Sequence, residues 1–388
     1  MAVTLVRPAA TYAAPGAAAV DAERIAPKAK SQRNAAIDVL RGGCIVMMIT
    51  SHVGPGSWVS MATHPLRFVS GAEGFVFLSG LVLGMVNRRK IASLGPLGAY
   101  RAVWRRARMI WLVHCATVAL ALATNAWIHR YPDFPDTHGF SAARLVWLTA
   151  TLRFQPGSLL NILPLYVVLL TLAPLALELL RRGWGAALLA ASLGLFLATQ
   201  YQPGLGAWVH PSCGGDAFPV PAWQFVFFGG LVVGYHSGAI RARLLSPFRR
   251  QWLIGLSAVC ALTAIVVWAQ TDTFGLYDHS AWDAFLWERH PLRLGRLIYF
   301  AVAIGAFYLW AQRISASGRL LAAPLRALAL LGKNSLYAFL AHLLVAFVLR
   351  ALPIPADRWW AIELSSISGV VVVYLMARYQ VARRWIPN

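Results

Sequence analysis

Long apolar runs recur along almost the whole of this 388-residue chain, and they constrain its fold more than any other feature. Each run holds about twenty residues with few charges, the length that an α-helix needs to cross a hydrocarbon core of about 30 Å. Hydrophobic residues make up 59% of the chain and charged residues 13%. We therefore expect an all-α integral membrane protein with about ten transmembrane helices. The expected spans are 36–54, 67–87, 109–128, 159–180, 184–200, 223–240, 251–270, 292–312, 328–349 and 359–378.

The segments between the spans alternate in charge. By the positive-inside rule, the segments rich in Lys and Arg are cytoplasmic, which places both termini in the cytoplasm. The net charge of +21 is therefore attributed to topology, and no nucleic-acid partner is expected. The basic segments are the N-terminal tail, 88–108, 181–182, 241–250, 313–326 and the residues after 377.

The first 33 residues are rich in Ala and Pro and contain no hydrophobic stretch with a small-residue cleavage site after it. This composition predicts a disordered cytoplasmic tail rather than a signal peptide. Residues 34–388 are expected to form one transmembrane domain.

One cluster in the sequence contains four possible ligands for a divalent metal. It comprises His129, Asp133, Asp136 and His138, which lie between two expected spans. Two prolines interrupt the cluster and no regular element supports it, so we interpret it as a solvated loop. No metal is expected.

The first span carries three ionisable side chains on one face. From Arg41 to His52 there are eleven steps of about 100°, which amount to three turns and about 20°. Asp38 lies three residues before Arg41 and therefore joins the same stripe. Ionisable groups inside a membrane helix are expensive, so this stripe predicts a functional site rather than contact with lipid.

The second span places Glu73 among aromatic and small residues. An ionised and solitary carboxylate at this depth is costly, so Glu73 must be paired, protonated or next to water. His52 and Glu73 both lie near the outer ends of consecutive spans, and a short loop can bring them together. We expect Glu73 to orient the His52 imidazole and stabilise its charged form, as general-base catalysis requires.

The span at 328–349 is unusually polar for a membrane helix. We expect it to line the same cavity as the first two spans. Its polar side chains are those of Lys333, Asn334, Ser335, Tyr337 and His342.

Several segments of the sequence resemble motifs of known protein families. Asp38-x2-Arg41-Gly42, with His52 eleven residues after Arg41, resembles the Arg-x10-His signature of the acyltransferase-3 superfamily of transmembrane acyltransferases. Glu73-Gly-Phe-Val-Phe-Leu-Ser-Gly80 is similar to the acidic-x-Phe-Phe-x-x-Ser-Gly segment of that superfamily. Three further segments resemble the OpgC family, which succinylates osmoregulated periplasmic glucans: Asn161-Ile-Leu-Pro-Leu-Tyr166, Pro221-Ala-Trp-Gln-Phe225, and Leu331-Gly-Lys-Asn-Ser-Leu-Tyr337 with His342.

The resemblance implies a multi-pass O-acyltransferase of the bacterial inner membrane. Such an enzyme moves an acyl group, expected to be succinyl, from cytoplasmic acyl-CoA to hydroxyls of a periplasmic glucan. His52, Glu73, Asp38 and Arg41 would form the catalytic group. A basic cluster at the inner mouth would join Arg41 in binding CoA; it comprises Arg88, Arg89, Lys90, Arg101 and Arg105. The residues expected to bind the glucan are Trp58, Trp223, Asn161, Asn334 and His342.

Two other classes of function remain open. A proton-coupled transporter of a sugar or organic acid would use His52 and Glu73 as a proton relay. A non-enzymatic membrane partner of a glucan export machine would need neither. The acyl group also stays open between succinyl and acetyl, because the sequence does not place the cation that a succinyl carboxylate would require.

Overall fold

Every regular element among the described residues is a helix, which confirms the all-α prediction for that part of the chain. The structure, a computed structural model, describes residues 34–64, 66, 68–128, 137, 139–155, 159–207, 218–244, 250–251, 253–258, 261–262, 286, 288, 292–317, 322–352, 355 and 358–381. The chain divides into Met1–Asn34 and Ala35–Asn388. The expected tail at 1–33 and the cluster between His129 and His138 lie outside the described residues.

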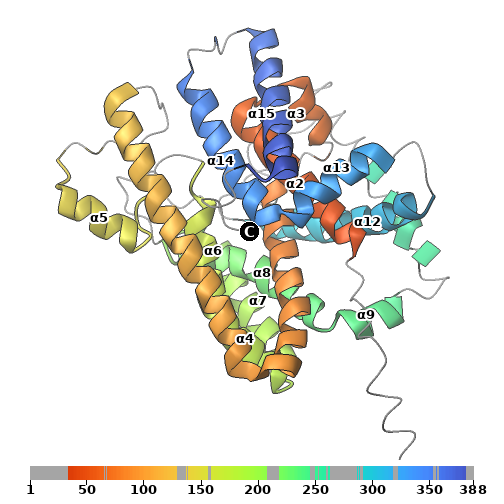
Figure 1. Cartoon of the computed structure of the whole chain (residues 1–388). Helices are drawn as coiled ribbons and strands as arrows, with labels where there is room; N and C mark the ends of the chain where they lie inside the picture. Colours follow the sequence, from red (N-terminus) through yellow and green to blue (C-terminus); the bar gives the residue numbers. More distant parts are fainter. Residues whose placement is uncertain are drawn as a thin grey trace, which may run out of the picture. The chain divides into compact units, whose positions relative to one another are not determined.

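The helices follow the expected spans closely in most of the described chain (Figure 1). Their bounds are α2 (Ala35–Val53), α3 (Trp58–Thr63), α4 (Gly71–Ile128), α5 (Ala142–Ala150), α6 (Ile162–Arg181), α7 (Gly185–Tyr201), α8 (Val220–Tyr235), α9 (Ser237–Leu244), α12 (Leu294–Ser317), α13 (Ala322–Lys333), α14 (Ser335–Ala351) and α15 (Trp359–Tyr379).

Five of the described helices are long and apolar enough to cross a membrane: α2, α4, α6, α12 and α15. Helix α4 covers residues 71–87 of the expected span 67–87 and the whole of the expected span 109–128. The spans at 184–200 and 223–240 correspond to the shorter apolar helices α7 and α8. Most of the span at 251–270 lies outside the described residues, so the count of ten and the orientation of the termini stay predictions.

Helix α4 consists of two arms that meet at Gly95 (Figure 1). Gly95 has φ 72° and ψ 168°, a conformation that side-chain-bearing residues rarely adopt. Pro96 follows directly and fits the first turn of the second arm, because the amide hydrogen that proline lacks has no partner there. The break therefore divides α4 into two helical arms, and each arm carries one of the two expected spans.

The first arm of α4 packs tightly against α8. Gly80 and Gly84 face Gly230 and Gly234, and a Cβ at any of the four would overlap the backbone of the opposite helix. Both helices thus carry small residues four positions apart, the pattern by which membrane helices approach most closely.

The expected span at 328–349 is broken in the structure, because the chain bends by 92° between α13 and α14. Asn334 stands at the bend with φ −104° and ψ 36°, and its side-chain amide donates to the Leu330 carbonyl at 3.0 Å. Asparagine competes in this way with the helical hydrogen bonds of the backbone. Hydropathy cannot reveal such a break, since the residues on both sides remain apolar.

The bend lays α13 across α2. A Cβ on Gly42 would overlap the backbone of Leu328, and a Cβ on Gly332 would overlap the backbone of Asp38. The two glycines therefore allow α13 to cover the part of α2 that carries Asp38 and Arg41.

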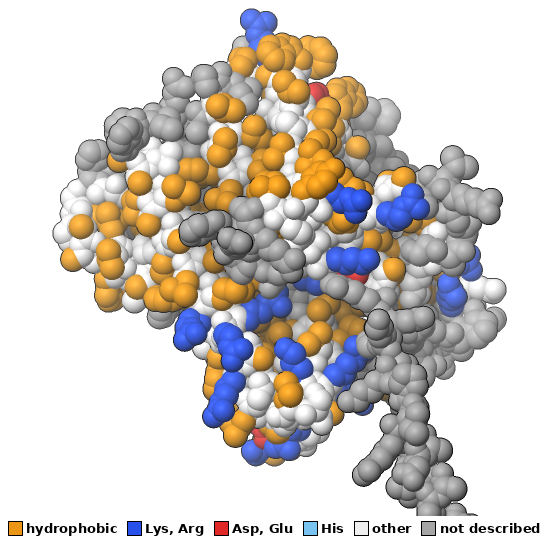
Figure 2. Space-filling model, viewed as in Figure 1, with side chains coloured by type: hydrophobic (Ala, Val, Ile, Leu, Met, Phe, Trp, Pro, Cys, Tyr) orange, Lys and Arg blue, Asp and Glu red, His pale blue; other side chains and the backbone are white. Residues whose placement is uncertain are grey.

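Basic side chains gather on one part of the surface. Figure 2 shows Lys and Arg concentrated in the lower half of the view, where Figure 1 places the bend of α4, while hydrophobic side chains predominate above. The positive-inside rule associates such a basic zone with the cytoplasmic side of a membrane.

Candidate functional site

Two histidines from distant parts of the chain meet at the end of α2. Nδ1 of His52 lies 3.1 Å from Nε2 of His342 on α14. The two rings are stacked, with centroids 5.3 Å apart and an interplanar angle of 12°. His342 is completely buried, whereas His52 is only partly buried. The predicted cavity-facing histidine is thus in direct contact with the predicted base.

The hydrogen bonds of this pair determine its protonation pattern. Nδ1 of His342 lies 2.6 Å from the carbonyl oxygen of Phe339, which only accepts, so His342 carries its hydrogen on Nδ1. Its Nε2 then accepts from Nδ1–H of His52. The lone pair of His52 consequently resides on Nε2, the tautomer that a general base requires.

Glu73 forms a buried ion pair with a residue that the sequence analysis did not identify. Nε of Arg296, on α12, lies 2.5 Å from Oε1 of Glu73, and the side chains are 9% and 0% exposed. The backbone N–H of Ser70 donates to the other carboxylate oxygen at 3.0 Å, and the Ser70 hydroxyl also contacts it. The expected need for a partner is met by an arginine near the start of the expected span 292–312.

The start of α4 lies deeper than expected. Gly71 and Gly74, which flank Glu73, pack directly against Cys44 of α2, about 12 Å along the helix from His52 at 1.5 Å per residue. The connection from α2 folds back along it, since the hydroxyl of Thr50 lies 3.0 Å from that of Thr63 at the end of α3. A direct pairing of Glu73 with His52 therefore stays a prediction.

Asp38 and Arg41 occupy the predicted common face of α2, and both are buried, with 4% and 7% exposure. The polar stripe thus faces the interior of the helix bundle, as the periodicity predicts.

The expected CoA-binding cluster lies on both sides of the α4 bend. Arg88, Arg89 and Lys90 precede Gly95, and Arg101 and Arg105 follow it. Of the five, Lys90 is half-buried and the others are exposed. Arg88 also donates to the carbonyl of Tyr235 on α8 at 2.8 Å. The chain reversal therefore brings the two basic segments to one end of the molecule.

The residues expected to bind the glucan are in diverse environments. Trp58 on α3 is 74% exposed, whereas Trp223 on α8 is completely buried and packs edge-to-face on Phe218. Its burial does not support a direct contact with an acceptor. Asn161 precedes α6, and its buried Oδ1 has no hydrogen-bond partner among the described residues. Asn334 forms the α13–α14 bend.

A cavity lies between the two arms of α4 and helices α6, α8 and α14. Its polar lining residues are Ser79, Arg106 and Tyr166, and the Tyr166 hydroxyl donates to Ser79 Oγ at 3.1 Å. Phe339 also lines the cavity and is stacked on Phe75. Because the Phe339 carbonyl binds His342, the cavity wall and the histidine pair share one residue.

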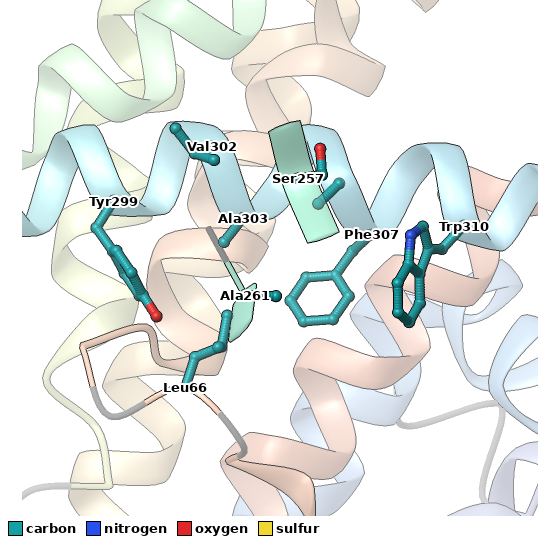
Figure 3. A pocket seen from close by; sticks show the side chains of 9 residues that line it. Leu66, Ser257, Ala261, Tyr299, Val302, Ala303, Phe307 and Trp310 are labelled. Atoms are coloured by element: carbon teal, nitrogen blue, oxygen red, sulfur yellow. The ribbon is translucent and has the colours of Figure 1, made fainter. Parts of the chain in front are cut away.

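Another cavity borders α12 and is shown in Figure 3. The polar groups among its described lining residues are the hydroxyls of Ser257 and Tyr299 and the indole N–H of Trp310. It offers no acid or base, so we place the candidate site at the histidine pair and the cavity beside Phe339.

The fold and this site define a helical membrane protein with buried ionisable side chains arranged for acid–base chemistry. The comparison of the whole chain with protein families identifies its group: the chain belongs to the OpgC protein family, which matches residues 33–385. Membership implies a glucan-modifying, acyltransferase-type membrane enzyme. No curated protein and no solved structure matches the chain.

Proposed function

We propose that this protein transfers an acyl group, expected to be succinyl, from acyl-CoA at its basic face to a hydroxyl of a periplasmic glucan at the opposite face of the inner membrane. The observation that carries the proposal is the His52–His342 pair. It equips a partly buried imidazole with a lone pair at Nε2, and membership of the OpgC family supports acyl transfer as the reaction.

In the proposed step, Nε2 of His52 takes the proton of the glucan hydroxyl while that oxygen attacks the thioester carbonyl carbon. A new C–O bond forms and the C–S bond breaks. The proton held by His52 then passes to the departing thiolate, so the products are an O-acyl ester and free CoA thiol. His342 stabilises the transient imidazolium by continuing to accept from Nδ1–H.

The axial position of His52 is compatible with a donor that enters from the basic face. Arg41 is eleven residues from His52, about 16 Å along α2 and roughly half of a hydrocarbon core of about 30 Å. The CoA phosphates would stay with the cluster around Gly95, because phosphate recognition is charge-assisted. Only the thin thioester arm would need to reach the histidine pair.

The buried pair Glu73–Arg296 would support the reaction indirectly. Glu73 lies beside the middle of α2, because the nearby Gly71 and Gly74 pack against Cys44. We propose that Glu73, Asp38 and Arg41 maintain the balance of charge around the donor, while His52 performs the proton transfer.

Incubation of the purified full-length protein with acyl-CoA and a periplasmic glucan tests this proposal. We expect stoichiometric release of CoA thiol and a mass increase of the glucan by one acyl group per transfer. Flux of a sugar or acid through proteoliposomes without CoA, with no ester formed, would instead support the transporter.

A further inference from the structure

One cation within the helix bundle has no role in the scheme above. Arg106 lines the cavity beside Phe339 and stands on the second arm of α4, eleven residues and so about 16 Å beyond Gly95. Among the described residues, no carboxylate forms an ion pair with it. Its side chain keeps exposed surface, as a group at the edge of an open cavity does.

The surroundings of Arg106 are mostly apolar. Phe75, Phe227 and Phe339 contribute aromatic walls to the cavity, and the hydroxyls of Tyr166 and Ser79 are its other polar side-chain groups. The guanidinium keeps exposed surface at the edge of these apolar walls, and it has no carboxylate partner among the described residues. The site is therefore poised for an anion that enters with a ligand.

The position of the cavity favours a particular anion. Phe339 belongs both to the cavity wall and to the support of His342, so a ligand in the cavity lies next to the reacting thioester. The phosphates of CoA are separated from the thioester by the long pantetheine arm and have their own basic cluster at the bend of α4. An anion close to the thioester must instead belong to the acyl group.

We propose that Arg106 binds the distal carboxylate of a dicarboxylic monoacyl group and thereby selects such donors over neutral acyl groups. This inference rests on the proposed acyl transfer. Guanidinium and carboxylate match in charge and in planar, two-pronged geometry. A neutral acyl chain of the same length would leave the guanidinium without that partner.

Succinyl-CoA and butyryl-CoA provide the direct comparison, since they share chain length and differ by a carboxylate in place of a methyl group. We expect wild-type protein to give a higher kcat/KM with succinyl-CoA. Arg106→Met should lower that value by about 10- to 100-fold, the range for a lost charge-assisted hydrogen bond, and leave butyryl-CoA nearly unchanged. Arg106→Lys should retain part of the preference.

Arg108→Met is the matched control, because it removes an exposed arginine from another face of the same helix. It should not alter the ratio between the two donors. If Arg106→Met fails to accumulate in the membrane, Arg106→Gln and the wild-type preference still test the inference. Two results would overturn this subsite alone. In the first, wild type shows no preference for succinyl-CoA over butyryl-CoA; in the second, the folded Arg106→Met and Arg106→Gln variants keep that preference. Failure of wild type to transfer either group would overturn the proposed function itself.

Discussion

Nδ1 of His52 and Nε2 of His342 lie 3.1 Å apart although 290 positions separate them in the chain. The first residue ends a span near the N-terminus and the second lies in the span that begins after the bend at Asn334. Their contact fixes which nitrogen of His52 is basic. The chemistry therefore depends on the packing of α14 against α2.

Replacement of His52 by Ala should abolish most transfer while leaving the fold intact. Loss of a general base lowers a rate by about 10²- to 10⁴-fold, and His52 is only partly buried. Single-turnover transfer and CoA binding should be measured together. His236→Ala, a histidine at the end of α8, is the control; near-normal turnover in His52→Ala would refute the assignment.

His342→Gln and His342→Phe separate orientation from substrate binding. The amide oxygen of Gln can accept from Nδ1–H of His52, whereas Phe preserves the ring volume without an acceptor. We expect a strong fall in kcat for Phe, partial rescue by Gln, and little change in either KM. A rise in the glucan KM with unchanged kcat would favour the substrate-binding role predicted from sequence.

Glu73→Gln and Arg296→Met should each destabilise the protein, because each leaves one buried member of an ion pair uncompensated. Breaking such a pair costs about 3–5 kcal/mol. Thermal unfolding in detergent should show a smaller loss for the double variant than for the sum of the singles. Additive losses would mean that the two side chains are not coupled. Glu73→Gln should also lower the transfer rate, but less than His52→Ala.

Joint replacement of Arg88 and Arg89 by Ala should raise the donor KM and leave the acceptor KM unchanged. The contact is expected to be electrostatic, so the difference from wild type should shrink as ionic strength rises. Isothermal titration with CoA provides the measurement, with Arg108→Ala as control. Identical titrations of variant and wild type would assign these arginines to topology alone.

Oriented proteoliposomes test the sidedness of the reaction. Product should form only with acyl-CoA on the basic side and glucan on the other, because the two binding regions are expected on opposite faces. Transfer with both substrates in one compartment of sealed vesicles would contradict a reaction across the membrane.

Some of this site follows directly from sequence. The periodicity of α2 predicts that Asp38 and Arg41 share a buried face, since helical geometry is local and regular. Glu73 was expected to need a partner because an isolated buried charge is too costly. These inferences require no knowledge of tertiary contacts.

The partners themselves were not predictable in the same way. Arg296 is 223 positions from Glu73, and nothing in local periodicity relates α12 to α4. The bend at Asn334 was missed because hydropathy is continuous across it, and the depth of Glu73 depends on how the connection through α3 folds back. Arg106 lies in the basic segment 88–108, and the sequence alone does not distinguish it from the other arginines of that segment.

The break between α13 and α14 also has an electrostatic consequence. A helix that starts inside the bundle presents its first amide groups there, with a partial charge of about +0.5 from the aligned peptide dipoles. Leu336, in the first turn of α14, borders the same cavity as Arg106. The main chain therefore supplies part of the attraction for an anion. Substitution of the side chains that line the cavity does not remove this part, whereas a change at Asn334 would move the start of α14 and with it the partial charge.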